Sequence, residues 1–321
     1  MNVIRGEKLD LTKYLQVDDE HAVVPASSWC DEVIHMFHQP DGSPMLPTLG
    51  WPKAPGHLFS FRPSEVTVWA GPNGSGKSML TSQVALNLCE QGEKVCVGSL
   101  EMKPFKTMGR MSRQASGSSE PSVQYIRDLH AWTDGRLWLY DQVGNVRPEK
   151  MVAVIRYARE KFGIGHFFID NLTKVVAGED DYNAQKNFVN TLTEVAHDTG
   201  VHIHLVAHVR KSGDEYARLG KNDIKGTGAI TDLADNVFMV QRNKKREAVE
   251  LGKLTVKDNQ EYDRVMAEPD CFLSLEKQRH GDWEGVFSFC FDRMSQQYVE
   301  VRGNNPRMYQ LDEVGFDVDN F

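Results

Sequence analysis

Eight consecutive residues have the types and the spacing of a loop that binds phosphate. They read Gly71-Pro72-Asn73-Gly74-Ser75-Gly76-Lys77-Ser78, which is the pattern G-x-x-x-x-G-K-S. Glycines let the backbone direct several N–H groups at one phosphate, and the N-terminus of a following helix adds positive potential. The loop therefore predicts a site for ATP, or another NTP or dNTP, with Mg²⁺. The expected nucleotide contacts are Gly71, Asn73, Gly74, Ser75, Gly76, Lys77, Ser78 and Met79.

Three further polar residues each end an apolar stretch that is typical of a buried strand. Glu101 follows Val95–Leu100, and a carboxylate there can take a proton from the water that attacks the γ-phosphate. Asp170 ends Phe167–Ile169, where a carboxylate can hold Mg²⁺ together with Ser78. Each has a simpler interpretation: Glu101 could be a solvated cap of the next helix, and Asp170 could only start a turn.

His208 ends the third of these stretches, and a loop with five basic residues follows it. The histidine could couple the state of the phosphate to the position of the loop, or it could be an ordinary satisfied polar residue. The loop could contact the phosphate backbone of a nucleic acid without reading its sequence. Alternatively, it is a solvated run of charge. The basic residues are Arg210, Lys211, Arg218, Lys221 and Lys225.

Lys277 and Arg279 lie two residues apart near the end of a predicted strand, so they share one face of it. They could form local salt bridges. They could equally project into the nucleotide of a neighbouring subunit, as an arginine finger does.

The elements that must position these residues alternate from Glu65 onward. Short apolar strands and helices follow each other, which predicts a mainly parallel sheet with helices on both faces and the ligand at the carboxyl ends of the strands. Beyond Asn236 the pattern predicts an antiparallel flank, and the charged segment 243–269 is expected to be solvated. The expected strands are Glu65–Ala70, Lys94–Leu100, Arg136–Tyr140, His166–Asp170, Val201–Ala207, Val237–Gln241, Cys271–Arg279, Val286–Asp292 and Gln297–Val301; the expected helices between them are Met79–Cys89, Pro104–Ala115, Ser122–Trp132, Pro148–Phe162 and Ala184–Thr199.

The first 60 residues are expected to be an appendage to this domain. A short amphipathic helix, Trp29–His38, must dock on its own core or on a neighbouring subunit, and the segment 40–55 is rich in Pro and Gly, as linkers are. We therefore predict three parts: a linker and docking segment 1–60, a nucleotide-binding domain 61–303 and an acidic tail 304–321.

Composition excludes several classes of protein. A net charge of −8 argues against a globally basic nucleic-acid coat, although a local basic patch is compatible with it. The five cysteines contain no C-x-x-C pair, which favours reduced thiols in a cytoplasmic protein over a zinc site. No apolar run approaches the roughly 18 residues of a membrane span, and the N-terminus lacks a signal-peptide core.

Taken in order, these motifs resemble the RecA-like hexameric replicative helicases: the bacterial DnaB-type enzymes, the mitochondrial Twinkle helicase and the phage primase-helicases. The resemblance covers roughly residues 60–301. Its most specific part is Asp223-Ile224-Lys225-Gly226-Thr227-Gly228-Ala229-Ile230, with Val240-Gln241-Arg242-Asn243 and Lys277-x-Arg279 after it.

The resemblance implies a role for each motif. Glu101 matches the catalytic glutamate and Asp170 the Walker B aspartate. His208 matches the γ-phosphate sensor, which is a histidine in the phage branch. Arg279 matches the finger supplied in trans, with Lys277 beside it, and the loop from Arg210 to Lys225 matches the segment that grips single-stranded DNA. Arg242 and Phe289 match positions that flank the base.

The resemblance therefore implies an ATP-driven homohexameric ring that translocates on single-stranded DNA and unwinds the duplex, in the host cytoplasm if a phage encodes it. The segment 311–321 is acidic and ends in Phe321, like the tail by which phage primase-helicases bind DNA polymerase; a solubilising tail is the alternative. Because no primase domain precedes the loop, priming would need a separate protein. A recombinase filament and an ATPase switch that recruits partners are the competing hypotheses.

Overall fold

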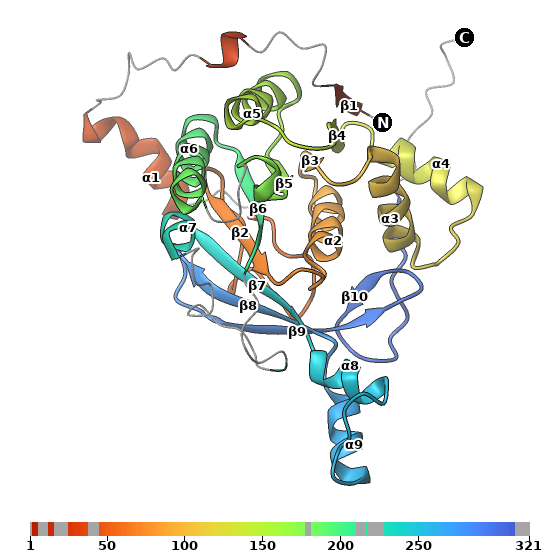
Figure 1. The fold of residues 1–321 in the computed structure, drawn as a ribbon. Helices are drawn as coiled ribbons and strands as arrows, with labels where there is room; N and C mark the ends of the chain where they lie inside the picture. Colours follow the sequence, from red (N-terminus) through yellow and green to blue (C-terminus); the bar gives the residue numbers. More distant parts are fainter. Residues whose placement is uncertain are drawn as a thin grey trace.

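The computed structural model describes residues 2–5, 12–15, 25–37, 45–176, 181–209, 216 and 228–311. In these residues ten strands form one sheet in the order β1-β4-β3-β5-β6-β2-β7-β8-β9-β10 (Figure 1). Pairing is parallel from β1 to β7 and antiparallel from β7 to β10. The strands are β1 Asn2–Arg5, β2 Val66–Gly71, β3 Val95–Ser99, β4 Leu137–Asp141, β5 His166–Asp170, β6 His202–His208, β7 Asn236–Arg242, β8 Cys271–Gln278, β9 Gly285–Asp292 and β10 Gln297–Val299. The predicted α/β class, with its antiparallel C-terminal flank, is confirmed.

Helices cover both faces of the parallel part of the sheet. Successive residues of a strand point to opposite faces, so Val68 packs with α5, α6 and α7 while Trp69 packs with α2, α3 and α4. Because both faces are covered, all six residues of β2 are buried. The helices are α1 Cys30–Phe37, α2 Lys77–Glu90, α3 Pro104–Ser116, α4 Val123–Trp132, α5 Pro148–Phe162, α6 Tyr182–Thr199, α7 Gly228–Leu233, α8 Lys244–Glu250 and α9 Asn259–Ala267. None of them combines the length and the apolar character that a membrane crossing needs.

The N-terminal region departs from the expectation of a separate appendage. Leu49, Trp51 and Phe59 are buried in the same core as α2, and the Trp51 indole N–H donates to the Tyr298 carbonyl at 3.0 Å. The prediction of a linker is therefore wrong from Leu49 onward. Burial of its apolar residues orders this stretch despite its Pro and Gly content. The strand β1, which we did not predict, adds a parallel edge to β4.

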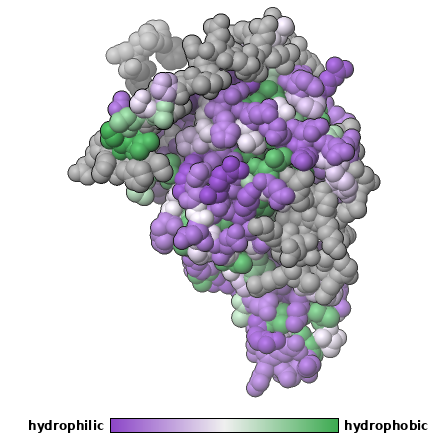
Figure 2. Space-filling model, turned by 90° about the vertical axis from the view of Figure 1, so that its left-hand side faces the viewer, coloured by the Kyte–Doolittle hydropathy of each residue, from purple (hydrophilic) through white to green (hydrophobic). Residues whose placement is uncertain are grey.

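The segment 243–269 is mostly exposed, as expected, but it is folded into helices. It forms the helices α8 and α9, which project from one end of the molecule (Figure 1). The surface of this projection is mainly hydrophilic (Figure 2), but Arg246 is buried beneath it. Arg246 donates to Asp270 at 2.5 Å and to Glu250 at 3.3 Å. Arg246 is thus buried by pairing with acidic neighbours, whereas most other charged residues of the segment are exposed, as expected.

The start of the expected tail belongs to the core. Tyr309 is 1% exposed, donates its backbone N–H to the Ala115 carbonyl at 2.8 Å, and hydrogen-bonds through its hydroxyl to Asn87. The Arg307 guanidinium contacts Glu90 at 2.9 Å. Residues 304–311 thus lie along α2 and α3, and residues 312–321 are outside the described part of the chain.

Candidate nucleotide-binding site

The glycine-rich loop lies between β2 and α2, as predicted. Gly71 ends β2, and a Cβ atom there would lie 2.3 Å from the Val240 carbonyl oxygen. Gly76 precedes α2 with φ +92°, a conformation that favours glycine. The Lys77 ammonium donates to the carbonyls of Gly71 at 2.7 Å and Pro72 at 2.9 Å. Burial lowers the pKa of Lys77 to about 8, while the Asp170 and Glu101 carboxylates oppose this shift.

Strand pairing brings the predicted site residues to one edge of the sheet. Gly71 pairs with His208, and Asp170 pairs with Ser99, which is two residues before Glu101. Parallel strands end at the same edge, so the loop, both carboxylates and the histidine meet there.

Asp170 and Ser78 form a candidate Mg²⁺ site. Burial raises the pKa of the Asp170 carboxyl, and a hydrogen bond from the Ser78 side chain opposes that rise. Arg110 of α3 donates to the Ser78 carbonyl at 3.1 Å. Among the described residues, no group of three or more His, Cys, Asp or Glu side chains could hold a metal. One hydroxyl and one carboxylate nevertheless fit Mg²⁺, which usually takes one or two protein ligands and completes its shell with phosphate and water.

Glu101 and His208 are joined by a residue that the sequence interpretation missed. The Asn171 side-chain nitrogen lies 2.9 Å from Glu101 Oε1 and 2.9 Å from His208 Nε2. Glu101 is exposed, whereas Asn171 is 1% exposed. Burial lowers the pKa of His208 to about 4; the nearby Lys77 ammonium lowers it further, and Glu101 acts against both. His208 is therefore neutral at pH 7.

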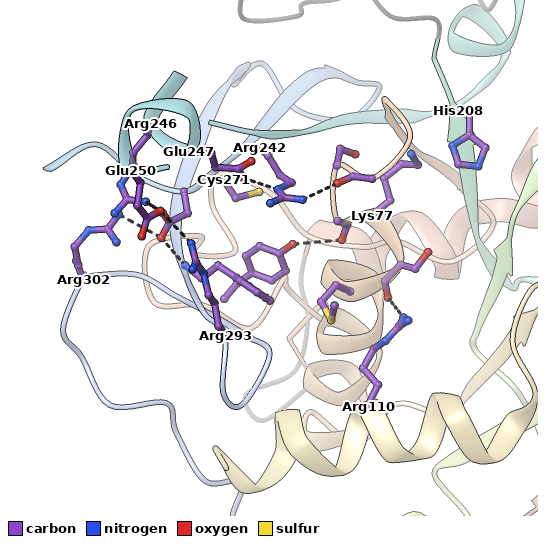
Figure 3. A pocket seen from close by; sticks show the side chains of 18 of the residues that line it. Lys77, Arg110, His208, Arg242, Arg246, Glu247, Glu250, Cys271, Arg293 and Arg302 are labelled. Atoms are coloured by element: carbon purple, nitrogen blue, oxygen red, sulfur yellow. Dashed lines mark hydrogen bonds and ion pairs between the residues drawn. The ribbon is translucent and has the colours of Figure 1, made fainter. Parts of the chain in front are cut away.

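A cavity of about 770 Å³ extends from the glycine-rich loop to α8 (Figure 3). Its volume is in the range of small-molecule and cofactor sites. Lys77, Arg110 and His208 line one end, and an arginine-rich cluster lines the other. Arg242 lies between them: its guanidinium donates to the Gly74 carbonyl at 3.3 Å and to Glu247 at 2.6 Å. The cluster consists of Arg246, Arg293 and Arg302 with Glu250 and Asp270.

The prediction that Phe289 flanks the base is wrong for this structure. Phe289 is 0% exposed and packs on Trp51 with ring centroids 4.7 Å apart, so it cannot stack on a ligand. Phe291, two residues further on the same face of β9, lines the cavity, as does Tyr298 of β10. The sequence motif identified the right strand but the wrong residue on it, because Phe289 faces the core whereas Phe291 faces the cavity. Arg242 does line the cavity.

Lys277 and Arg279 lie far from the loop of their own chain. Lys277 pairs with Val237 near the start of β7. It therefore lies at the end of the sheet where the parallel strands begin, opposite to the end that holds the glycine-rich loop. Its ammonium donates to the carbonyls of Thr231 at 3.0 Å and Asp232 at 2.8 Å. Arg279 forms an ion pair with Asp235 at 2.8 Å, while its side chain stays 47% exposed. The local salt bridge that we considered is thus present for Arg279.

The predicted DNA-binding residues Arg210, Lys211, Arg218, Lys221 and Lys225 lie outside the described residues. Several residues at the site had not been predicted, including Arg110, Tyr298 and Asn171. Arg110 and Tyr298 carry no motif and reach the cavity only because α3 and β10 pack beside α2. Asn171 could have been suspected, because a polar residue that directly follows the carboxylate of a predicted strand end lies at the same edge.

Comparison with known proteins gives a consistent result. Residues 60–214 match the family model of the AAA domain. The DNA helicase/primase of Enterobacteria phage T3 is 24% identical over 57% of this chain and 36% of that protein. This chain therefore spans about a third of the length of that curated relative.

Two solved structures share the fold. One is the ATPase domain of G40P, with a TM-score of 0.67 and 15% identity over 87% of this chain and 99% of that one. The other is a DnaB-like replicative helicase, studied with its interactions with primase. It has a TM-score of 0.67 and 16% identity over 86% of this chain and 68% of that one.

Proposed function

We propose that this chain is an ATP-driven DNA helicase. It has the RecA-like fold of a DnaB-like replicative helicase ATPase domain and is distantly homologous to a phage helicase/primase. The observation that carries the proposal is that Lys77, Ser78, Glu101 and His208 line one cavity, while Asp170 hydrogen-bonds with the Ser78 side chain beside it. Such an arrangement suits cleavage of a terminal phosphate by water.

Each side chain has a task in this reaction. The Lys77 ammonium exchanges its two loop carbonyls for the β- and γ-phosphate oxygens. Glu101 accepts a proton from the attacking water. Ser78 and Asp170 would hold Mg²⁺, which, when bound, neutralises charge that develops on the phosphates. His208 is neutral and meets the γ-phosphate as a hydrogen-bond donor rather than as a cation.

The complete site is assembled from two subunits of a ring. Arg279 and Lys277 lie at the opposite edge of the sheet from their own loop, so they can serve only the nucleotide of a neighbour. Half of the Arg279 side chain is open to solvent, as such a role requires. The ring is a homohexamer, and the basic residues between positions 210 and 225 grip single-stranded DNA in its channel.

Two partners extend the proposal. The acidic segment 311–321 binds a DNA polymerase, and a separate primase supplies primers. Removing residues 312–321 should weaken binding to the polymerase and leave ATP hydrolysis unchanged, because the core ends with Tyr309 and Leu311. An unchanged polymerase affinity would contradict the role of the tail.

Rates of ATP hydrolysis with and without single-stranded DNA, together with unwinding of a forked duplex, test the function. We expect DNA to stimulate hydrolysis and the fork to be opened only with ATP. Lys77→Ala, the matched control, should abolish both activities because the phosphate loses its cation. Strand exchange without unwinding would instead support a recombinase, and hydrolysis that ignores DNA would support an ATPase switch.

A further inference from the structure

The side-chain amide of Asn171 has one possible orientation. The Thr173 hydroxyl donates to its oxygen at 2.6 Å, which leaves the NH₂ group to face Glu101 and His208. An amide nitrogen carries two hydrogens, and each has an acceptor here. A flipped amide would set its oxygen against the Glu101 carboxylate, where both groups are acceptors, so the carboxylate favours the orientation seen in the structure. The network is therefore fully satisfied in one arrangement.

This arrangement determines where the proton of His208 lies. Because Nε2 accepts a hydrogen from Asn171, the neutral ring must carry its hydrogen on Nδ1. Nδ1 is buried and has no hydrogen-bond partner. An unpaired buried donor costs about 1–3 kcal/mol, and an acceptor in the cavity would recover that cost once the ring turns to bring the buried Nδ1 toward it. His208 lines the cavity beside Lys77, so a terminal phosphate oxygen is the acceptor that the site offers.

We propose that Asn171 is a positioning residue that joins the phosphate-facing histidine to the general base. When the γ-phosphate accepts the Nδ1–H of His208, the ring is fixed, and Asn171 fixes the Glu101 carboxylate through the same amide. The position of the base is thus tied to that of the histidine ring that faces the phosphate. This inference rests on the proposed function, because it assigns Asn171 within the same hydrolytic site.

Asn171→Leu, which keeps the size of the side chain but removes both donors, tests the coupling. We expect kcat for ATP to fall about tenfold to hundredfold, a part of what a general base contributes. The Kd for ATP should change by less than about twofold, because Lys77 and the loop amides are untouched. Thr173→Val should produce a smaller loss, because the amide can then flip. Asn190→Asp, an exposed residue of α6, is the matched control.

A double-mutant cycle with His208→Ala separates positioning from general damage. If the two residues act as one unit, the second substitution costs little once the first is made, and the measured losses do not add. A kcat for Asn171→Leu within about twofold of the wild-type value would overturn the inference, and so would losses that add fully. A faster DNA-independent rate would also overturn it, because Asn171 would then restrain the base.

The histidine tautomer gives a measurement that does not depend on hydrolysis. In nitrogen-15 spectra of histidine-labelled protein, the His208 signal, identified by its loss in His208→Ala, should have the Nδ1–H pattern in the wild-type chain. It should lose that pattern in Asn171→Leu. An Nε2–H pattern in the wild-type protein would refute the link. If the wild-type chain shows the Nδ1–H pattern but does not hydrolyse ATP, only the proposed function fails.

Discussion

At the scale of single residues, the loop has no room for a side chain at Gly76. A Cβ atom there would lie 2.3 Å from the phenolic oxygen of Tyr298, which itself donates to the Gly76 carbonyl at 3.4 Å. Trp51 and Gln83 in turn hold the Tyr298 backbone. The tyrosine cannot swing away easily, so the last strand of the sheet supports the shape of the phosphate-binding loop.

We therefore predict that Gly76→Ala lowers the free energy of unfolding by about 1–3 kcal/mol, the usual cost of strain at one backbone position. It should also weaken ATP binding, measured by titration of a fluorescent analogue. Gly74→Ala is the matched control, because Gly74 has φ +74° but open space around its Cβ position. Adding Tyr298→Phe should recover part of the loss at Gly76. Equal costs at both glycines would contradict a packing role for Tyr298.

At the scale of elements, strands β5 and β6 share a buried chain of histidines. The Trp69 indole donates to Nδ1 of His204, so His204 must donate from Nε2 to Nδ1 of His166, 3.1 Å away. His166 then directs its Nε2–H at Glu93, 3.5 Å away. His202 donates to the Arg62 carbonyl at 2.6 Å and contacts the Thr67 hydroxyl at 2.8 Å. His204 is satisfied only when it is neutral, because its Nδ1 accepts from Trp69 while its Nε2 donates.

This histidine chain predicts a loss of stability in acid. Burial lowers the pKa of His202 to about 3 and that of His204 well below its ordinary value of 6.5. The unfolded chain therefore binds more protons than the native protein between about pH 6.5 and pH 3. The free energy of unfolding should fall as pH decreases through this window. Each of the two histidines contributes up to about 1.4 kcal/mol per pH unit.

Denaturant unfolding at several pH values measures the effect. His204→Gln should make the dependence shallower by about one proton, even if it lowers stability at neutral pH. His57→Gln, at an exposed position, should leave the slope unchanged. If the free energy of unfolding depends on pH with the same slope in the wild type, His204→Gln and His57→Gln, the buried histidines are not the source of that dependence.

Regular elements of the parallel region were predictable because their apolar runs end at clear signals. The prediction for α5, Pro148–Phe162, is exact; Pro148 begins the helix and Gly163, with φ 70°, ends it. Leu49 and Phe289 were misjudged because their burial depends on contacts across the sheet that no local pattern records. The place of Asn171 at the site could be suspected from the strand-end carboxylate before it, but its partners could not, because they stand 70 and 37 positions away in the chain.

At the scale of the whole molecule, the groups that we propose for catalysis lie at opposite ends of the strands of the sheet. The loop, Glu101, Asp170 and His208 lie at one edge, whereas Lys277 and Arg279 lie at the other. A head-to-tail ring brings unlike edges of neighbouring subunits together, and its closure gives every subunit one complete site. A single chain of the proposed ring, in contrast, has these groups at opposite ends of its strands and cannot bring them together.

Mixing two inactive chains tests this division. In a ring of Arg279→Ala and Lys77→Ala subunits, some interfaces are complete. At these interfaces the Arg279→Ala subunit contributes its intact glycine-rich loop, and the Lys77→Ala subunit contributes its intact Arg279. Random equimolar mixing makes about a quarter of the interfaces complete, so up to about a quarter of the wild-type ATPase rate should return. The control is a mixture of the Lys77→Ala chain with a chain that carries both Lys77→Ala and Arg279→Ala. This mixture forms no complete interface. If the first mixture is as inactive as this control although mixed rings form, then Arg279 does not act on a neighbour's nucleotide, and its ion pair with Asp235 is its whole role.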